Sequence, residues 1–511
     1  MFLCFVPAFA ERGPSFHGIW AAMSNVLFPS AELAPFVKRG GVADVAAALP
    51  KALRGLGHKV TVVVPKTGPG TEGSSGFDDR GTLLARRLTP LQVKVGADTI
   101  TVTVYDGRLS SQVDLCVLEW AEALAVPTIY DGDAARLSAT FSGAIAELAR
   151  TWAEAGNAPD IVHLNDWPTA PAAAKIAELR AKGGALANVK TVLTVHSFAH
   201  QGIHSREAFG LLGLPAEQFG VEGFEFHGHT NFLKGGLKAA DLVTTVSPTY
   251  AREVASGPRG EGLEGVVASL RTPLIGIVNG VDYSVWNPAT DSALAGRFDA
   301  EDASNKVRCK ADFVRERFGT YDPELPLVGF VGRFDAQKGI DSLLAALPTL
   351  LRATDAQVVL VGTGESKYVT AATELAEQSM GRVLYLGHAS DAEVRRLFAA
   401  ADVIVVPSRF EPCGLVQMYA QRYGAFPVAN ATGGIVDTLV DCDSHLETGT
   451  GFLYEGATDG EVEGIVAATE RALAALTHTR AAALRRRIMR LDRGWDRPAR
   501  QIDRLYARLL A

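Results

Sequence analysis

The residues best suited to chemistry stand in loops that follow short apolar runs. Within residues 403–419 the run Val403–Val406 is broken by Pro407, and the carboxylate of Glu411 follows. A short β-branched run bounded in this way predicts a buried parallel strand. Open parallel sheets bind ligands beyond the carboxyl ends of their strands. The sequence therefore predicts that Glu411 faces a ligand.

A pair of glycines follows the next apolar run. Residues 426–429 lead into Thr432, Gly433 and Gly434, and a helix-compatible segment comes after them. Consecutive glycines at a helix start let backbone N–H groups approach an anion closely. Each motif alone has a plain alternative, an ordinary loop acid or an ordinary turn. Their positions on neighbouring strand ends favour a carboxylate beside a phosphate cradle.

Two cations stand on another predicted strand-end loop. Arg333 and Lys338 are separated by the letters FDAQ, and Gly339 follows them. A single loop cation is usually only solvated. Arg binds phosphate by a planar fork and Lys binds it as a point charge, so together they suit a diphosphate. Because such cations and helix amides can stabilise a leaving diphosphate, and no His/Asp/Glu cluster has metal-ligand spacing, we expect no metal and no cofactor.

Two other residues have several interpretations. His196 ends an apolar run and suits an acid or base, a hydrogen-bond partner of a sugar, or a structural histidine; the sequence alone slightly favours the last. Cys413 lies between Pro412 and Gly414 without a histidine nearby in the sequence. A thiol nucleophile needs a neighbour that lowers its pKa, so we expect Cys413 to be a packing residue whose backbone matters more than its sulfur.

The beginning of the chain repeats the strand, loop and helix pattern. Residues 25–28 predict a strand, and Lys38, Arg39, Gly40 and Gly41 precede a helix-compatible segment. Glycines and cations in this position suit an anion. The segment lacks the fingerprint G-x-G-x-x-G, so a nicotinamide dinucleotide is not implied.

The same alternation continues along the chain. Apolar runs followed by polar residues or glycine stand at 60–64, 161–164, 192–195, 242–246 and 275–278, and again at 327–331, 358–361 and 383–386. Strands that alternate with helices imply right-handed crossovers and parallel sheets. The two series are separated by a polar region at 287–322. We therefore expect an α/β protein with two Rossmann-like domains and a deep cleft between their parallel sheets.

Composition excludes several classes of protein. The chain has 511 residues, 47% of them hydrophobic and 21% charged, which is long enough for two or three globular domains. The net charge of −7 argues against a nucleic-acid partner. No apolar run approaches the roughly 20 residues of a membrane span. We expect a soluble protein without a membrane partner.

Cysteine usage bears on the compartment. The five cysteines, Cys4, Cys116, Cys309, Cys413 and Cys442, include no C-x-x-C pair. This scatter is typical of a reducing compartment, so we expect a cytoplasmic protein. Residues 1–22 contain a short apolar run that resembles a signal peptide but lacks a basic start, and we expect them to be a dispensable extension.

Several segments together resemble bacterial glycogen synthase and plant starch synthase, in the right order from about residue 25 to residue 510. They are KRGGVADV (38–45), HSFAHQG (196–202), NFLKGGLKAADLVTTVSPTYAREV (231–254), GIVNGVDYSVWNPATD (276–291), GRFDAQKG (332–339), PSRFEPCGLVQMY (407–419) and ATGGIVDT (431–438). The resemblance implies a GT-B fold and retaining transfer of glucose from ADP-glucose to the 4-hydroxyl at the non-reducing end of an α-1,4-glucan such as glycogen.

The resemblance also implies domain boundaries. The first domain would comprise residues 23–253, joined by a terminal helix within 490–511 that crosses back onto it. The second, nucleotide-sugar-binding domain would comprise residues 254–489.

Carried over position by position, the resemblance assigns three groups of residues. Residues at the reacting centre would be His196, Arg333, Lys338 and Glu411. Donor-binding residues would be Lys38, Gly40, Gly41, Asn279, Cys413, Gly414, Thr432, Gly433 and Gly434. Acceptor-side residues would be Asp44, Asp166 and Trp167.

Three positions depart from the family's usual pattern. Arg39 stands where the family has Thr or Val, Pro168 where it has His, and Ser197 where it has Asn. They motivate an alternative, a GT-B enzyme with another nucleotide donor or a small acceptor. A non-catalytic glucan-binding protein is a second alternative, although it would not need a diphosphate clamp. A hydrolase would need two opposed carboxylates, and only Glu411 has a privileged position.

Overall fold

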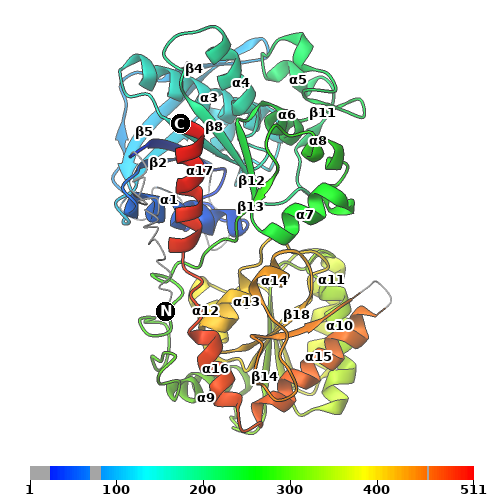
Figure 1. Cartoon of the computed structure of the whole chain (residues 1–511). Coiled ribbons are helices and arrows are strands. Elements are labelled where there is room, and N and C mark those ends of the chain that lie inside the picture. Colours follow the sequence, from blue (N-terminus) through cyan, green and yellow to red (C-terminus); the bar gives the residue numbers. More distant parts are fainter. Residues whose placement is uncertain (1–22, 69–76, 78–81, 457–459) are drawn as a thin grey trace, which may run out of the picture.

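The chain folds into two α/β domains stacked one above the other (Figure 1). The computed structural model describes residues 23–68, 77, 82–456 and 460–511. The expected extension at residues 1–22, with Cys4, lies outside the described residues. None of the helices in the described part of the chain is long and apolar enough to cross a membrane.

The first domain is built on a ten-stranded sheet in the order β13-β12-β8-β7-β1-β2-β6-β5-β3, with β4 paired to β5. Its strands are β1 (Asn25–Pro29), β2 (Lys59–Pro65), β3 (Ala85–Arg86), β4 (Leu91–Val95), β5 (Asp98–Arg108), β6 (Asp114–Glu119), β7 (Ile161–Asn165), β8 (Lys190–Val195), β12 (Leu242–Thr245) and β13 (Ile275–Gly276). Its helices are α1 (Gly41–Gly55), α2 (Ala121–Leu124), α3 (Ala134–Glu154), α4 (Pro171–Ala181), α5 (Ala208–Leu211), α6 (Phe232–Ala239), α7 (Pro248–Ser256) and α8 (Glu264–Ala268). A small sheet of β9 (Ile203–His204), β10 (Glu225–Phe226) and β11 (His229–Asn231) is added to this domain.

Strand β1 shows why the predicted strands are continuous apolar runs. Val26, Leu27 and Phe28 are all fully buried. Successive side chains of a strand point to opposite faces of the sheet. Leu27 packs into the core shared with α3 and α4, whereas Val26 and Phe28 pack into the core shared with α1. Because helices cover both faces, each position of the strand must be apolar.

The first sheet has the predicted parallel strands, and it also has antiparallel strands on one side that were not predicted. Strand β5 pairs antiparallel with both β4 and β6. Only two residues separate β4 from β5, and one of them is Gly96 with φ +60°. A two-residue turn returns the chain alongside itself, whereas a parallel crossover needs a longer connection.

The second domain has a parallel sheet in the order β16-β15-β14-β17-β18-β19. Its strands are β14 (Leu327–Val331), β15 (Gln357–Val361), β16 (Val383–Leu386), β17 (Val403–Val406), β18 (Phe426–Asn430) and β19 (Phe452–Tyr454). Its helices are α9 (Asn305–Phe318), α10 (Ile340–Ala353), α11 (Ser366–Gln378), α12 (Asp391–Ala400), α13 (Val416–Arg422), α14 (Gly433–Thr438), α15 (Glu461–Leu476) and α16 (Ala481–Met489). Strand β14, next to β17, lies in the middle of this sheet, so the loops after these two strands leave it side by side.

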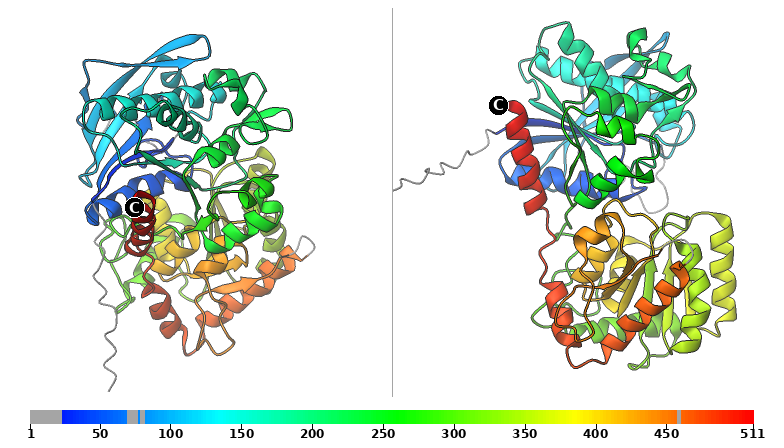
Figure 2. Two further views of the ribbon diagram at one scale, coloured as in Figure 1. Left: turned by 45° about the horizontal axis from the view of Figure 1, so that its top comes forward. Right: turned by 45° about the vertical axis from the view of Figure 1, so that its right-hand side comes forward.

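The terminal helix α17 (Asp496–Leu510) returns to the first domain, as the resemblance implied (Figures 1 and 2). Its apolar stripe includes Ile502 and Tyr506, which are buried in the core beneath α1. The hydroxyl of Tyr506 lies 2.5 Å from Nδ1 of His163, and Asp503 lies 3.0 Å from Nε2 of His58. Apolar burial and two polar contacts thus fix this helix.

The first domain extends further than predicted. Strand β13 pairs in parallel with β12, at Thr244–Ile275 and Thr245–Gly276. The boundary predicted between residues 253 and 254 is therefore too early, because a strand of the first sheet follows it. The next segment and the approach to α17 run together between the domains, where Val281 bridges to Gly494.

Candidate functional site

Two loops of the second domain bring Lys338 and Glu411 together. Lys338 Nζ lies 2.5 Å from Glu411 Oε2, and Ser408 Oγ donates to the same oxygen at 3.0 Å. The Lys338 side chain is 20% exposed and that of Glu411 is 9% exposed. Gly339 permits this approach, since it has φ +65° and an added Cβ would lie 2.0 Å from the Pro407 carbonyl oxygen.

Arg333 stands on the same loop as Lys338 and is more exposed. Its Nε donates to Asp335 at 2.8 Å and its Nη2 donates to Gln337 at 2.9 Å, and 46% of its side chain is exposed. Asp335 also accepts the backbone N–H of Lys338 at 2.9 Å. The two predicted cations therefore share one organising carboxylate, that of Asp335.

The glycine pair packs tightly on the Glu411 loop. A Cβ added to Gly433 would lie 2.1 Å from the Glu411 carbonyl oxygen, and one added to Gly434 would lie 2.4 Å from Cα of Cys413. Gly433 also has φ +46°. Glycine is therefore required at both positions by close backbone approach.

The N–H groups of this glycine pair already have protein partners. Gly434 N donates to the Glu411 carbonyl oxygen at 2.8 Å. Gly433 N donates to Oε1 of Glu253, a residue of the first domain, at 2.9 Å. Sequence reasoning proposed these amides as a phosphate cradle, and in this structure a carboxylate oxygen takes the position of an anion at Gly433.

Cys413 is a buried thiol that contacts the segment between the two domains. It is 5% exposed, and burial raises its pKa to about 12, although the backbone N–H of Asn279 donates to it. A thiol with a raised pKa is a poor nucleophile, which agrees with the expected packing role. Gly414, with φ +76°, turns the chain into α13. Thr432 is buried and immediately precedes α14.

On the first domain, Lys38 lies between two carboxylates. Its Nζ is 2.9 Å from Asp44 Oδ1 and 3.6 Å from Asp391 Oδ1 of the second domain. Burial acts to lower the pKa of Lys38, but Asp44 and Asp391 outweigh it and hold the pKa above its usual value. Burial likewise raises the pKa of Asp44. Asp44, predicted on the acceptor side, thus pairs with a predicted donor residue.

A buried carboxylate that sequence reasoning missed organises the loop of Gly40. Glu32 is 4% exposed, and its Oε2 accepts the N–H groups of Arg39 at 2.6 Å and Gly40 at 2.8 Å. The Tyr130 hydroxyl donates to Oε1 at 3.1 Å. Burial raises the pKa of Glu32. Its only sequence signal was an acid in the loop directly after the first strand.

The side chain of Arg39 turns to the outer part of the same loop cluster. Its Nη1 donates to Asp131 at 2.8 Å and to Thr128 at 3.2 Å. Gly41 begins α1, and a Cβ at this position would lie 3.5 Å from Cδ1 of Leu415 in the second domain. Gly41 therefore lies at the domain interface.

His196 is held by the two residues that follow β7. Its backbone N–H donates to Asp166 Oδ1 at 2.6 Å, and its Nε2 lies 3.0 Å from Asn165 Oδ1. Asn165 Nδ2 donates to the Pro29 carbonyl, so its oxygen must face the histidine. Nε2 of His196 is then the protonated ring nitrogen. Burial lowers the pKa of His196 to about 4, so the ring is neutral.

Asp166 and Trp167, both predicted on the acceptor side, differ in how well they are suited to contact a ligand. Asp166 has φ +58°, and burial raises its pKa to about 7 against the lowering effect of the His196 N–H. Trp167 is 8% exposed and packs against Tyr130 and Phe232. Packing therefore occupies most of Trp167, whereas Asp166 combines a strained backbone with a shifted pKa, as functional residues often do.

The carboxyl ends of the two sheets meet across the interface. A small cavity of about 10 Å³ is lined by residues of the first domain, among them Asn165 and His196, and by Asn279 of the segment that follows β13. Contacts between the domains include Lys38 with Asp391 and Gly433 with Glu253. The predicted deep cleft is thus narrowed by direct contacts in this structure, and residues of both domains lie close together around it.

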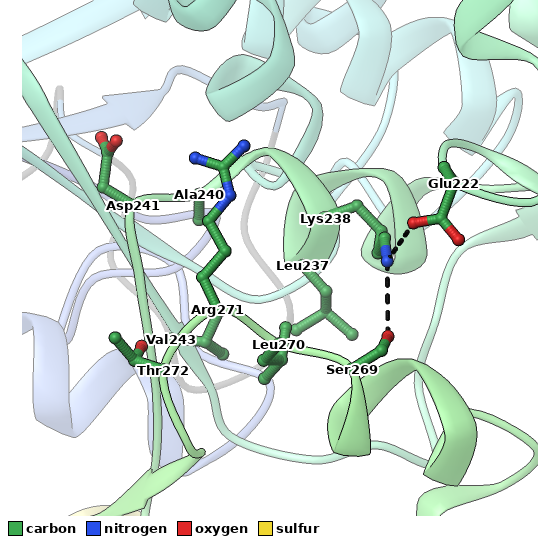
Figure 3. A pocket seen from close by; sticks show the side chains of 10 residues that line it. All are labelled: Glu222, Leu237, Lys238, Ala240, Asp241, Val243, Ser269, Leu270, Arg271 and Thr272. Carbon is green, nitrogen blue, oxygen red and sulfur yellow. Dashed lines mark hydrogen bonds and ion pairs between the residues drawn. The ribbon is translucent and has the colours of Figure 1, made fainter.

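A larger cavity lies elsewhere, beside the amino end of β12, and Figure 3 shows the residues that line it. It measures about 330 Å³ and is lined by residues around the start of β12, including Lys238, Asp241 and Arg271. Lys238 pairs with Glu222 at 2.5 Å and donates to Ser269 at 3.3 Å. Ligands of parallel sheets bind at the carboxyl ends of the strands, so this cavity is not the predicted site.

Within the described residues, no three His, Cys, Asp or Glu side chains form a group that could hold a metal ion. The residues that could bind an anionic ligand are instead the cations Lys38, Arg333 and Lys338. Each of them is paired with a carboxylate of the protein. An anionic ligand can bind these cations by taking the place of their carboxylate partners. The neutral ring of His196 and the buried carboxylate of Glu411 are the other polar groups of the candidate site.

Comparisons with known proteins cover both domains. A family model described as starch synthase catalytic domain matches residues 25–269, and one described as glycosyl transferases group 1 matches residues 325–475. A glycogen synthase of Anaeromyxobacter sp. is 39% identical over 496 residues, which cover 95% of this chain and 100% of the relative. A glycogen synthase of Thioalkalivibrio sulfidiphilus is 40% identical over 506 residues, with 95% and 100% coverage.

Solved structures are similar as well. The catalytic domain of starch synthase IV from Arabidopsis thaliana, bound to ADP and acarbose, has a TM-score of 0.86 at 29% identity, covering 96% of this chain and 100% of that one. A sucrose-phosphate synthase from Thermosynechococcus elongatus has a TM-score of 0.60 at 20% identity, with 95% and 99% coverage, and shares the fold.

Proposed function

Because the chain belongs to the bacterial glycogen synthase family of glycosyltransferases, with a GT-B fold, we propose ADP-glucose as its donor. Glucose is transferred with retention to the 4-hydroxyl at the non-reducing end of an α-1,4-glucan. The observation that carries this proposal is the pair of Lys338 and Glu411, with Arg333 on the same loop as Lys338. The similar catalytic domain of Arabidopsis starch synthase IV is bound to ADP, which supports a nucleoside diphosphate as a ligand of this chain.

Arg333 and Lys338 are proposed to hold the diphosphate of the donor. As the bond between the glucosyl carbon and oxygen lengthens, negative charge grows on the departing diphosphate. Cations then bind the transition state more tightly than the ground state. Arg333 is exposed enough to turn from Asp335, and Lys338 already points to the Glu411 loop. Lys38 and the glycines at 40–41 close the site from the first domain.

Glu411 is proposed to bind hydroxyls of the glucosyl unit and to favour positive charge at its reacting carbon. Its own backbone is fixed by Gly434, and its side chain is fixed by Ser408 and Lys338. When Lys338 engages the diphosphate, Oε2 of Glu411 becomes an acceptor for a sugar hydroxyl. Separating Lys338 from Glu411 in this way costs less free energy than leaving either charge buried without a partner, because Lys338 gains the diphosphate and Glu411 gains a sugar hydroxyl.

His196 is proposed to contact the sugar as a neutral ring. With Nε2 donating to Asn165, Nδ1 is the acceptor nitrogen and suits a sugar hydroxyl. The backbone around His196 lies near the bond that breaks, and Asp166 lies on the acceptor side.

We propose no requirement for a metal ion, since the cations supply the charge that a metal would. Four cysteines, Cys116, Cys309, Cys413 and Cys442, are free and buried, which supports action in the reducing cytoplasm.

A donor and acceptor panel tests the proposal. ADP-glucose and UDP-glucose are each supplied with glycogen, maltose or no acceptor, and release of the nucleoside diphosphate is measured with and without EDTA. We expect ADP release that depends on glycogen and is unaffected by EDTA, with a product that an α-1,4-specific glucosidase digests. A preference for UDP-glucose or for a small acceptor would replace the proposed substrates, and Arg39, Pro168 and Ser197 would be the first positions to examine.

A further inference from the structure

Two helices from different domains exchange hydrogen bonds next to the site. Helix α7 follows β12 of the first sheet, and helix α14 follows β18 of the second. The carboxylate of Asp437 on α14 accepts both the backbone N–H and the Oγ1 hydroxyl of Thr249 on α7, each at 2.8 Å. The carboxylate of Glu253 on α7 accepts the N–H of Gly433 on α14 at 2.9 Å. Each helix thus donates from its first turn to an acid of the other.

The spacing of the four residues is the same on both helices. Thr249 and Glu253 are four residues apart, and so are Gly433 and Asp437. Residues four apart lie on one face of a helix. On each helix an N–H donor lies in the first turn and an acid lies one turn later. The donor of each helix can meet the acid of the other only if the two helices run in opposite directions.

The acids are poorly placed for their own helices. Glu253 and Asp437 both lie in the last turn, where the partial negative charge of exposed carbonyl groups disfavours an acid. Among the described residues, the N–H groups that donate to these two acids come from the opposite domain. In addition, Oε2 of Glu253 is buried with no hydrogen-bond partner among the described residues. Burying a carboxylate oxygen without a hydrogen-bond partner destabilises the folded chain. If the two domains were apart, Glu253 would be open to water and this cost would be absent.

The two helices connect directly to the two halves of the site. The hydroxyl of Tyr250 on α7 accepts the N–H of Phe198, two residues after His196, at 2.9 Å. The N–H of Gly434 on α14 donates to the carbonyl oxygen of Glu411 at 2.8 Å. One hydrogen bond on each side therefore separates the helix pair from the loops of His196 and Glu411.

We propose that Thr249, Glu253, Gly433 and Asp437 form an interdomain latch that fixes His196 opposite Glu411 when the domains close. They are positioning residues, since their contacts reach the site through the loops just described. The expected effect of the latch on kcat rests on the proposed glucosyl transfer. Its effect on the domain arrangement is independent of which donor is used.

Glu253→Gln and Asp437→Asn test the latch, because both keep the shape of the side chain and remove its charge. The matched control is Glu470→Gln, which removes an exposed acid of α15. Thr249→Ser keeps both donors to Asp437 and serves as the conservative variant. Small-angle scattering of the ligand-free full chain gives the radius of gyration, and steady-state kinetics gives kcat and KM for each substrate.

We expect both test variants to have a larger radius of gyration than the wild type. We also expect kcat to fall about tenfold, the loss expected for a hydrogen bond to a charged group, with KM for glycogen unchanged. Glu470→Gln and Thr249→Ser should behave like the wild type. If either test variant is too unstable to purify, Thr249→Val removes the hydroxyl donor from the same contact.

Test variants with the wild-type radius of gyration overturn the latch, whether or not their activity falls. An equal effect of Glu470→Gln overturns it too, because the change would then reflect net charge. A chain that opens in the variants but uses no ADP-glucose keeps the latch and rejects the proposed function. Thermal unfolding of each variant shows whether the separate domains remain folded.

Discussion

Replacing Lys338 by alanine separates the structural and the chemical roles of the cations. The side chain of Glu411 is 9% exposed, and within the described residues the mutation leaves its carboxylate with the hydroxyl of Ser408 as a hydrogen-bond partner. At 2.5 Å, with an effective dielectric constant of 20, the lost attraction is about 7 kcal/mol before desolvation is subtracted. Removal of one member of a buried ion pair costs about 3–5 kcal/mol. Since Lys338 is 20% exposed, we expect about 3 kcal/mol of lost stability.

Arg333→Ala is the matched comparison. Arg333 is 46% exposed and its partner Asp335 retains the backbone N–H of Lys338, so we expect a stability change within about 1 kcal/mol. In the proposed mechanism, both mutations remove a cation from the leaving diphosphate. Both should therefore lower kcat by about 10²- to 10³-fold and leave KM for glycogen intact.

Chemical denaturation and steady-state kinetics measure the two effects separately. In the double variant Lys338→Ala, Glu411→Gln, the unpaired charge is gone, so stability should recover while kcat stays low. The reasoning is refuted if Arg333→Ala destabilises the protein as much as Lys338→Ala does. It is also refuted if either single variant changes only KM for glycogen.

Three further predictions follow from the site and the core. Glu411→Gln should lower kcat by as much as Lys338→Ala if its charge serves the transition state; a drop of less than tenfold, measured with saturating ADP-glucose, would restrict Glu411 to binding hydroxyls. Ser197→Asn should raise donor turnover about fivefold, by a hydrogen bond's worth of roughly 1 kcal/mol, and a loss of turnover would show that the site is built for another substrate. Burial lowers the pKa of His163 to about 3, so between pH 6.5 and 3 the unfolded chain binds a proton that the folded chain does not. Stability should therefore fall with falling pH, by about 2 kcal/mol from pH 6.5 to 5 for this residue. His163→Gln should flatten that slope in urea unfolding and exposed His445→Gln should not; equal slopes in all three proteins would contradict the assignment.

The strands and their loops were readable from the sequence because they are local. The runs at 327–331, 383–386 and 403–406 have the predicted bounds, since a strand covered on both faces must be apolar at each position. The order of the loops then placed Arg333, Lys338 and Glu411 at one edge of one sheet. The antiparallel strands β4 and β5 were missed, and β13 lies beyond the predicted boundary, because the pairing of a strand depends on what lies beside it.

The partners of the site residues were decided by the tertiary structure. Lys338 meets Glu411 across 73 residues, and Gly433 meets Glu253 across 180 residues. Sequence identified Gly433 as a residue with a useful N–H but could not say which oxygen accepts it. The sequence marked Glu32 only as an acid in the loop after the first strand; its burial and its contacts with the backbone of Arg39 and Gly40 give the carboxylate its role in holding that loop.

Residue types and spacing therefore determined which groups of this chain can bind an anion or a sugar, because chemistry and local backbone geometry are properties of short segments. The packing of two domains determined which carboxylate each cation faces, which amides are already occupied, and how buried each group is. Those quantities set the pKa of His196 and Asp166, and they depend on residues that are distant in the sequence and close only in the folded chain.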